Sequence, residues 1–235
     1  MHAFYHLNIS LGENLLSKEE SHHLLKVLRL KEGEEIFLLD GCGIIAKAEL
    51  IGKEGSLAKA RVLSIDHSDI LQPEISLYIS PPKSSDRLDF IIEKATELGV
   101  STFIFLHCRN SERKNIRLDK IEQKIQAACK QSLRAHFPKV IDMTPLSSLT
   151  LVAESQNLLF HCQDHMDRQE IEDIKIADKL GLFIGPEGDF SKDEVLHLVE
   201  QGLHSTSLGE QRLRTETAVL SAIVKSQTLH KLQRR

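Results

Sequence analysis

The 235-residue sequence lacks several features that mark common classes of protein. No apolar run approaches the roughly 20 residues that a membrane-spanning helix needs. The N-terminal stretch MHAFYHLNIS has neither the basic nor the apolar region of a secretory signal. The four cysteines lie far apart without a C-x-x-C pair, which is typical of reduced thiols rather than of a disulfide framework or a zinc site. We therefore expect a cytoplasmic protein with no membrane partner.

Metal and nucleotide motifs are also missing. His161 and His165 are four residues apart, but His161 ends a strand-like run, where this spacing does not bring two rings together, so no metal site is expected. The loop PPKSSD (81–86) contains no glycine and cannot be a Rossmann dinucleotide turn. With two tyrosines and no tryptophan, the chain has few side chains on which bases could stack.

The charge is unevenly distributed. The net charge of −4 argues weakly against a nucleic-acid partner, but residues 109–139 contain nine lysines and arginines against three acidic residues. Such a local surplus is typical of a surface that contacts phosphates. A solvated basic helix face explains it equally well.

Residues 1–70 read as short strands interrupted by one helix. The strands are expected at FYHLNI, EEIFLLD, GIIAKAELIG and LAKARVLSID. The helix is expected to begin at Ser17, which has Glu20 in the capping-box position, and to end at Gly33. This arrangement predicts a small β-barrel domain.

From residue 73 onward, buried strands alternate with helices. The strands are expected at EISLYIS, STFIFLH, KVIDM, NLLFHC, KLGLFIG and LHSTSL. Helices are expected at DRLDFIIEKATEL and at SKDEVLHLVEQ, which opens with a capping box from Ser191 to Glu194. The pattern predicts an α/β domain with a parallel sheet over residues 73–235.

Two late glycine loops suggest a binding pocket. Gly185-Pro186-Glu187-Gly188 follows one buried strand, and the Leu208-Gly209 step follows the next. Ligands of open parallel sheets lie at the carboxyl ends of strands, and glycines let a backbone approach them closely. With Phe160 and His161 at the end of a third strand, these loops predict one shared pocket. A tight connection without a ligand is the alternative for residues 185–188.

Two arginines stand just before the last helix. Arg212 and Arg214 precede the apolar run AVLSAIV. A helix start carries unpaired N–H groups and a partial positive charge, so this segment is suited to hold an electron-rich group.

Five segments together resemble one known family. They are HHLLKVLRLKEG (22–33), EKATELGV (93–100), KQSLRAHFP (130–138), FIGPEGDFS (183–191) and LGEQRLRTETA (208–218). In this order the chain resembles the RsmE family of 16S ribosomal RNA uridine N3-methyltransferases of the SPOUT class. The resemblance implies a PUA-like RNA-binding β-barrel, an α/β domain tied in a deep trefoil knot, S-adenosylmethionine as methyl donor, and a homodimer that acts on the decoding region of the small ribosomal subunit. General topology rules argue against a knot.

The resemblance also implies roles for residues. Cofactor binding falls to Phe160, His161, Ile184, Gly185, Pro186, Glu187, Gly188, Leu208, Gly209 and Leu213. RNA binding falls to Lys26, Arg29, Arg113, Lys114, Lys130 and Arg134. Arg214 would stabilise the uracil anion. Glu216 would orient Arg214, cap the helix or act as a base, and Glu187 would hold its loop.

The sequence departs from the family pattern at three positions. Asp189 stands where members often have a glycine, and it is expected to matter little if the Gly188 backbone makes the contact. Gln211 stands where an arginine is common, next to Arg212 in place of an aliphatic residue. The role of Arg212 therefore stays open.

Other functions remain compatible with the sequence. One is a ribose 2′-O-methyltransferase of the same class. Another is a non-catalytic RNA-binding protein that has kept the pocket. A phosphate-binding enzyme ranks last, because no Lys-Ser or Lys-Thr follows the glycines of residues 185–188.

Overall fold

A computed structural model describes residues 2–151, 155–163 and 166–234. The chain divides into two compact units. The first contains Met1–Ile70 and Gln126–Phe137, and the second contains Leu71–Ile125 and Pro138–Arg235. No helix within the described residues is long and apolar enough to cross a membrane.

The first unit contains a five-stranded sheet. Its strands are β1 (Ala3–Tyr5), β2 (Gly12–Leu15), β3 (Glu35–Leu39), β4 (Ile44–Glu54) and β5 (Leu57–His67), in the order β1-β3-β4-β5-β2. β1 is parallel to β3, and the other pairs are antiparallel. Every second residue of β4 from Ala46 to Leu50 is buried, as expected for a strand with one face on a core. The core also takes residues from β1, β3, β5 and the helical segment.

The helix of the first unit is shorter than the sequence predicts. α1 (Lys18–His22) continues as one π-helical segment, η1 (His23–Val27). Arg29 then adopts a φ of +56°, and the Leu30 N–H donates to the Leu24 carbonyl at 3.1 Å. The backbone therefore leaves the helix before Gly33, because a left-handed residue cannot continue a right-handed helix.

A segment from the middle of the chain belongs to the first unit, although the sequence pattern groups it with the second domain. Residues 126–137 contact the helix and the loops of the first unit through an ion pair and hydrogen bonds. Lys130 forms an ion pair with Glu20 at 2.8 Å, the Phe137 N–H donates to the Gly41 carbonyl at 2.9 Å, and His136 Nε2 lies 2.6 Å from the Ser68 carbonyl. These long-range contacts leave no periodic signal in the sequence.

The second unit contains a seven-stranded parallel sheet. Its strands are β6 (Glu74–Ile79), β7 (Val100–His107), β8 (Lys139–Pro145), β9 (Gln156–Phe160), β10 (Gln169–Glu170), β11 (Lys179–Ile184) and β12 (His204–Ser207), in the order β10-β12-β9-β11-β6-β7-β8. The expected strands of this half are present, and the two-residue β10 is an addition at the edge. The predicted α/β class with a parallel sheet is confirmed.

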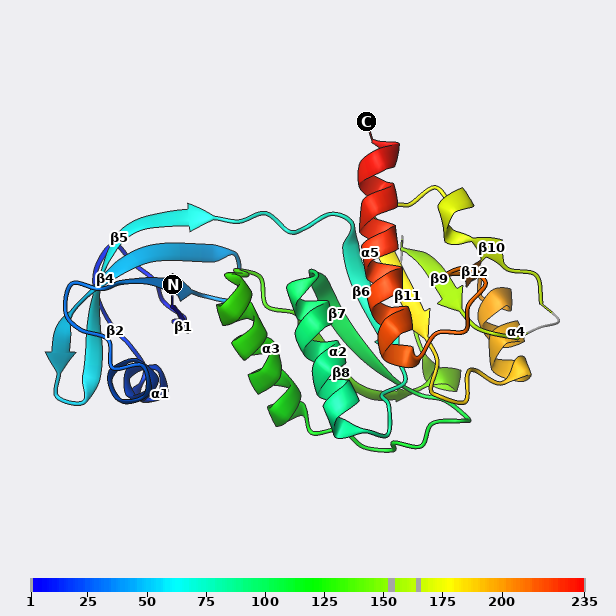
Figure 1. Cartoon of the computed structure of the whole chain (residues 1–235), viewed down its shortest axis with the longest axis horizontal. Coiled ribbons are helices and arrows are strands. Elements are labelled where there is room, and N and C mark those ends of the chain that lie inside the picture. The colour runs from blue at the N-terminus through cyan, green and yellow to red at the C-terminus, as the bar shows by residue number, and fades with distance from the viewer. Residues whose placement is uncertain (1, 152–154, 164–165, 235) are drawn as a thin grey trace. The chain divides into compact units, whose positions relative to one another are not determined.

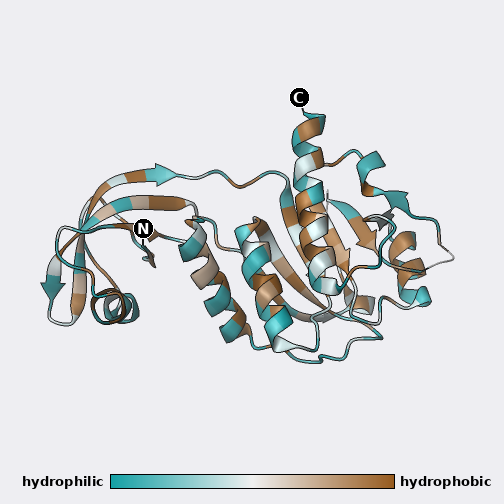
Figure 2. Cartoon of the chain, viewed as in Figure 1, coloured by the Kyte–Doolittle hydropathy of each residue, from teal (hydrophilic) through white to brown (hydrophobic). Residues whose placement is uncertain are grey.

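Three helices of the described chain pack on this sheet, namely α2 (Ser85–Glu97), α4 (Lys192–Glu200) and α5 (Thr215–Gln233), and short 3₁₀ turns lie at η2 (Leu146–Ser148) and η3 (Ile171–Asp173). The remaining helix, α3 (Leu118–Ser132), begins in the second unit and ends in the first. α2 and α5 pack against each other and against β7 and β11 (Figure 1). α4 packs through Val195 and Leu198 on a cluster that includes Tyr78 and Phe183, whose rings stack at 4.0 Å. Figure 2 shows strands that are largely hydrophobic between helices with mixed surfaces, as burial on two faces requires.

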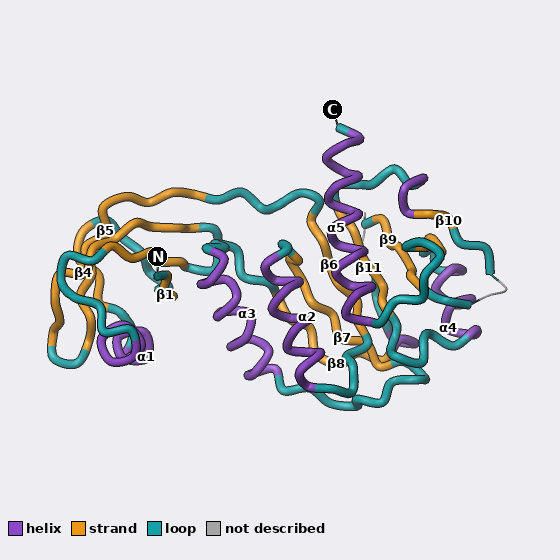
Figure 3. Tube along the Cα trace, viewed as in Figure 1, coloured by secondary structure: helices purple, strands orange, loops and turns teal. Residues whose placement is uncertain are grey.

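The order of the strands brings three loops together at the carboxyl ends of neighbouring strands. β12, β9 and β11 are adjacent and parallel, so the loops that follow them all leave from the same side. The loop 208–213 then carries the chain from β12 to α5, which contacts β11 (Figure 3). Because β9 separates β12 from β11, this loop passes the carboxyl end of β9. Whether it completes a trefoil knot stays a prediction.

Candidate functional site

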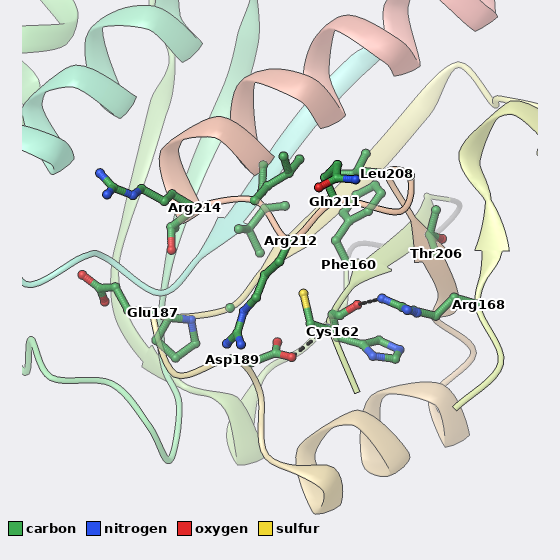
Figure 4. Close-up of a pocket in the computed structure, with 18 of the residues that line it drawn as sticks. Phe160, Cys162, Arg168, Glu187, Asp189, Thr206, Leu208, Gln211, Arg212 and Arg214 are labelled. Carbon is green, nitrogen blue, oxygen red and sulfur yellow. Dashed lines mark hydrogen bonds between the residues drawn. The ribbon is translucent and has the colours of Figure 1, made fainter. Parts of the chain in front are cut away.

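A cavity of about 410 Å³ lies where these three loops meet. Both glycine loops contribute to it, so residues 185–187 and 208–214 surround one space, as the sequence predicts (Figure 4). Nine of the ten residues expected to bind a cofactor line it, namely Phe160, His161, Ile184, Gly185, Pro186, Glu187, Leu208, Gly209 and Leu213. Phe160 and Ile184 are the last residues of β9 and β11 and stand side by side in the register of the sheet.

Glycine is needed at positions 185 and 209 of the cavity for different structural reasons. A Cβ on Gly185 would lie 3.0 Å from the backbone nitrogen and ring of Phe190, so this glycine makes room for Phe190 rather than for a ligand. Gly209 has a φ of +121°, and a Cβ on it would meet nothing within 4 Å. Both glycines line the cavity, so a close approach of their backbone to a ligand stays a prediction, and Gly185 is in addition required by its contact with Phe190.

Gly188 is the predicted residue that is not among the cavity-lining residues described. Its carbonyl accepts a hydrogen bond from Asn110 Nδ2 at 3.1 Å, and a Cβ on it would lie 3.2 Å from Asn110. Its neighbour Asp189 lines the cavity instead. A ligand contact of the Gly188 backbone stays a prediction, and Asp189 places a side chain on the cavity wall beside it.

Asp189 joins two of the loops. Its Oδ2 accepts the Cys162 N–H at 2.7 Å, and its Oδ1 accepts the N–H of the following residue, Phe190, at 2.8 Å. Its φ is +62°, a left-handed conformation that glycine adopts more readily. This explains why a glycine suits the position and what the carboxylate adds.

His161 is buried in the cavity wall and only 4% exposed. Its Nδ1 accepts the Gln163 N–H at 3.2 Å, so the ring proton is assigned to Nε2, which donates to Ser205 Oγ at 2.6 Å. Burial lowers the pKa of His161 below its usual value, the Asp189 charge opposes this, and the Arg168 charge adds to it. The ring is therefore held neutral and is a structural member of the wall rather than an acid.

Arg214 is the N-cap residue of α5 and lines the cavity. Its guanidinium is exposed and has no hydrogen bond or ion pair with any described residue. Arg212 lines the same cavity and points toward Asp189, whereas Arg214 points the other way (Figure 4). A charged group without a partner at a helix start is suited to contact a ligand.

Glu216 does not pair with Arg214. Its Oε1 lies 3.8 Å from Arg87 Nε, and its Oε2 is buried without a hydrogen-bond partner among the described atoms. Arg87 belongs to α2 and lines the cavity, while Glu216 is not among the residues that line this cavity. The guanidinium that Glu216 can orient is therefore that of Arg87.

Two predicted residues brace the loop after β6. Glu187 Oε1 accepts the Lys83 N–H at 3.0 Å. Arg113 donates from Nε to the Pro82 carbonyl at 2.8 Å and from Nη2 to the Lys83 carbonyl at 2.6 Å. Glu187 therefore holds the loop after β6. The Arg113 guanidinium is occupied by backbone carbonyls of the same loop.

The other predicted RNA-binding residues differ in their surroundings. The side chains of Lys26, Arg29 and Lys114 are exposed and have no partner among the residues described. Lys130 is only 18% exposed and is engaged by Glu20. Burial lowers the pKa of Arg134, which is partly enclosed. Lys26, Arg29 and Lys114 are thus available to a phosphate, and Lys130 is not.

Several cavity residues were not predicted. They are Arg87, Cys162, Arg168, Asp189, Thr206, Gln211, Thr215 and Ala218, whereas Arg212, which also lines the cavity, was named with its role left open. Most of them adjoin the predicted motifs and could have been included by extending each loop. Arg87 follows the first strand of the sheet, a position where ligand sites gather. Nothing in the sequence points to Arg168, which reaches the cavity from a separate segment.

The described residues contain no group of three or more His, Cys, Asp or Glu side chains that could hold a metal ion. His165, which was considered with His161 as a metal pair, lies outside the described residues.

Comparison with known proteins bears on the whole chain. The family model of the RNA methyltransferase domain matches residues 71–227, and that of the RNA methyltransferase PUA domain matches residues 16–63. Ribosomal RNA small subunit methyltransferase E of Mycobacterium bovis is 31% identical over 220 residues, which cover 87% of this chain and 82% of the relative.

Solved structures agree over nearly the full length. A probable rRNA methyltransferase from Porphyromonas gingivalis has a TM-score of 0.89 and 30% identity, covering 99% of this chain and all of that one. Ribosomal RNA small subunit methyltransferase E from Neisseria gonorrhoeae, bound to S-adenosyl methionine, has a TM-score of 0.88 and 31% identity, covering 97% of this chain and 98% of that one. The chain therefore belongs to the RNA methyltransferase family, and within it to the ribosomal RNA small subunit methyltransferase E (RsmE) proteins.

Proposed function

We propose that this chain transfers the methyl group of S-adenosylmethionine to N3 of a uridine in the decoding region of 16S ribosomal RNA. Membership of the RsmE proteins supports the reaction class, and the Neisseria gonorrhoeae relative is bound to S-adenosyl methionine. The observation that carries the proposal is the single cavity between the loops 185–189 and 208–214, with an unpaired guanidinium on its wall.

The cavity suits the proposed cofactor in size and chemistry. Its volume of about 410 Å³ is within the roughly 300–1,000 Å³ of small-molecule sites. Phe160, Ile184, Leu208 and Leu213 supply apolar walls for an adenosyl group, and the open backbone at Gly209 can approach it closely. Lys225 Nζ donates to the Leu208 carbonyl at 3.1 Å and keeps this turn in place.

When bound, S-adenosylmethionine supplies an electrophilic methyl group on a positively charged sulfur. The N3 proton of uracil must leave for N3 to accept that methyl group, and the negative charge then spreads over the ring oxygens. The Arg214 guanidinium would donate hydrogen bonds to those oxygens and stabilise the anion in the transition state. Its position at the start of α5 adds the partial positive charge of the helix.

Glu216 has a supporting part in this proposal. Its carboxylate orients Arg87, which enters the cavity from α2 and adds a second guanidinium near the acceptor. Because its Oε2 is buried and its Oε1 faces Arg87, Glu216 is a positioning residue rather than a base.

The RNA is held through its phosphates by exposed basic residues. Lys26 and Arg29 of the first unit and Lys114 of the second have side chains free for this contact within the described structure. Phosphate contacts supply affinity and register, and the resulting affinity falls with added salt. The substrate places the protein in the cytoplasm, where small ribosomal subunits are found.

A homodimer forms part of the proposal. Phe90 of α2 and Leu220 and Val224 of α5 supply the apolar side chains of a groove that is also lined by Glu216, Thr217 and Ser221. Phe90 and Val224 remain 43% and 45% exposed. Exposed apolar surface of this kind marks interfaces, and a second copy would cover the groove. The particle mass in solution tests this point.

The reaction is tested by incubating the protein with labelled S-adenosylmethionine and small subunits that lack the modification. Digestion of the RNA to nucleosides followed by mass analysis should find the label in N3-methyluridine. Label in a 2′-O-methylated nucleoside would replace the proposal with ribose methylation. Absence of both label and cofactor binding would leave an RNA-binding protein without catalysis.

A further inference from the structure

One peptide bond in the cavity wall is held at both of its polar groups. The His161 carbonyl accepts a hydrogen bond from Arg168 Nη1 at 2.7 Å. The Cys162 N–H, which belongs to the same peptide group, donates to Asp189 Oδ2 at 2.7 Å. We call this group the 161–162 peptide. Both Arg168 and Asp189 line the cavity, so a cationic and an anionic side chain grip the peptide from within the site (Figure 4).

A further contact joins the same segments. Gln163 Nε2 donates to the Phe190 carbonyl at 2.8 Å, next to the Asp189 contact. Asn110 Nδ2 donates to the Asp189 carbonyl at 3.0 Å and steadies the turn from the other side. The loop after β9 and the loop after β11 are thereby fastened together across the edge of the sheet.

The backbone conformation at position 189 suits glycine better than aspartate. Its φ of +62° is the left-handed conformation, which glycine adopts more easily than aspartate does, although the local hydrogen bond from the Phe190 N–H to Oδ1 helps aspartate to adopt it. A residue in such a conformation persists when the surrounding contacts hold it there. At this position the carboxylate makes such a contact, because Oδ2 is the acceptor for the Cys162 N–H.

We propose that Asp189 is a positioning residue for the cofactor, which clamps the 161–162 peptide with Arg168 and thereby fixes the wall formed by Phe160, His161 and Cys162. This inference rests on the proposed function, because the ligand that the wall serves is S-adenosylmethionine. The strained backbone is kept for the clamp and not for the stability of the fold.

The proposal makes stability and binding move in opposite directions. Asp189→Gly relieves the backbone and removes the clamp, so the unliganded protein should unfold at the same or a higher temperature while it binds the cofactor less well. A residue that only supported the fold would lower both together. Asp189→Asn keeps an oxygen that can accept from Cys162 but removes the charge, so it separates the hydrogen bond from a direct electrostatic contact with the ligand.

The experiment compares the wild type, Asp189→Gly, Asp189→Asn and the control Asp193→Asn, whose side chain is 83% exposed in the neighbouring helix. Thermal unfolding and hydrogen exchange of the Cys162 amide are measured without ligand, and affinity for S-adenosylmethionine is measured by calorimetry. We expect Asp189→Gly to expose the Cys162 amide and to weaken binding by about tenfold or more, the effect of losing one charge-assisted hydrogen bond. Asp189→Asn should lie close to the wild type, and Asp193→Asn should match it.

Three outcomes would overturn the inference. They are wild-type affinity in Asp189→Gly, a fall in its unfolding temperature that parallels the loss of affinity, and binding by Asp189→Asn as weak as that of Asp189→Gly. The last result would make Asp189 a direct charge contact instead of a clamp. A wild-type chain that binds no S-adenosylmethionine would remove the proposed function as well, and so the two failures can be told apart.

Discussion

Arg214 places a guanidinium on the cavity wall, and the structure gives this group no internal partner among the described residues. Replacing it by alanine should lower the rate of methyl transfer by about 100- to 1,000-fold, the usual effect of removing one donor to a developing anion. The affinity for S-adenosylmethionine should change little, because apolar walls and backbone supply that contact. Single-turnover kinetics and calorimetry on the same preparation measure the two quantities.

The conservative variant Arg214→Lys provides the comparison. It keeps the charge but loses the planar fork, so its rate should lie between those of wild type and Arg214→Ala. Equal losses of rate and of cofactor affinity in Arg214→Ala would remove this residue from the catalytic role. Arg212→Ala, measured alongside, decides whether the neighbouring arginine shares it.

His161 gives the stability a predictable pH dependence. Burial lowers its pKa in the folded protein, whereas in the unfolded chain it takes up a proton near pH 6.5. Below that pH the unfolded state binds more protons than the folded state, so stability falls as the pH falls toward the lowered pKa. The unfolding free energy from urea titrations at pH 7.5 and 5.5 should drop more for the wild type than for His161→Gln. The same drop in both proteins would contradict this account.

Single residues of the cavity differ in how visible they are in the sequence. The glycine loops and Arg214 stand out because few backbone positions need glycine and few helix starts carry paired arginines. The sequence does not show the contact of the Asp189 carboxylate with Cys162, because Cys162 lies 27 positions away and the two meet only in the folded chain. The contact of Arg168 with the cavity wall likewise depends on where its segment lies relative to β9, which the sequence does not show.

At the scale of elements, the two predicted capping boxes turned out differently. Ser191 and Glu194 form a complete box at the start of α4. At α1, Ser17 accepts the Glu20 N–H, but the Glu20 carboxylate turns to the Tyr5 N–H and to Lys130 instead. A capping box is thus a local preference that a buried ion pair can override.

The complete box should have a measurable effect on stability. Ser191→Ala removes the acceptor for the Glu194 N–H and should lower the free energy of unfolding by about 1 kcal/mol. Glu194 keeps its contact with the Arg109 N–H, so α4 should remain docked. Urea unfolding of Ser191→Ala beside Ser64→Ala, an exposed serine of β5, tests the value. A change no larger than that of the control would show that the cap is not needed.

Strands were predicted more successfully than the ends of helices. Runs such as KLGLFIG are apolar throughout because both faces of a parallel strand are covered, and this pattern is local. β2 and β10 were not predicted, because β2 contains the polar residues of GENL and β10 has only two residues. The helix predicted from Ser17 to Gly33 is longer than the helix observed, because no sequence rule anticipates a left-handed conformation at Arg29.

At the scale of the whole molecule, two features depend on contacts between distant segments. The segment 126–137 joins the first unit through bonds to residues more than 60 positions away, such as that between His136 and Ser68. Periodicity cannot reveal such a partner. The trefoil knot, which comes from the family resemblance, stays a prediction for the same reason.

The salt dependence of the RNA affinity should distinguish basic side chains that contact phosphates from basic side chains that are buried in the protein. Neutralising Lys26, Arg29 or Lys114 one at a time should reduce the slope of log affinity against log salt by about one each. Lys130→Gln should leave the slope unchanged and lower the unfolding free energy by about 3 kcal/mol, because Glu20 loses its buried partner. Anisotropy titrations of a small-subunit RNA fragment give the slopes. A reduced slope for Lys130→Gln would return this residue to the RNA surface.

The account depends most on what the cavity between the two late glycine loops binds. Calorimetric titration of the chain with S-adenosylmethionine is the most direct test, with Leu213→Trp as the variant that fills the cavity. We predict one saturable site per chain in the wild type and loss of that site in a folded Leu213→Trp protein. No binding to the wild type, or equal binding to both proteins, would contradict the assignment of this cavity to the methyl donor.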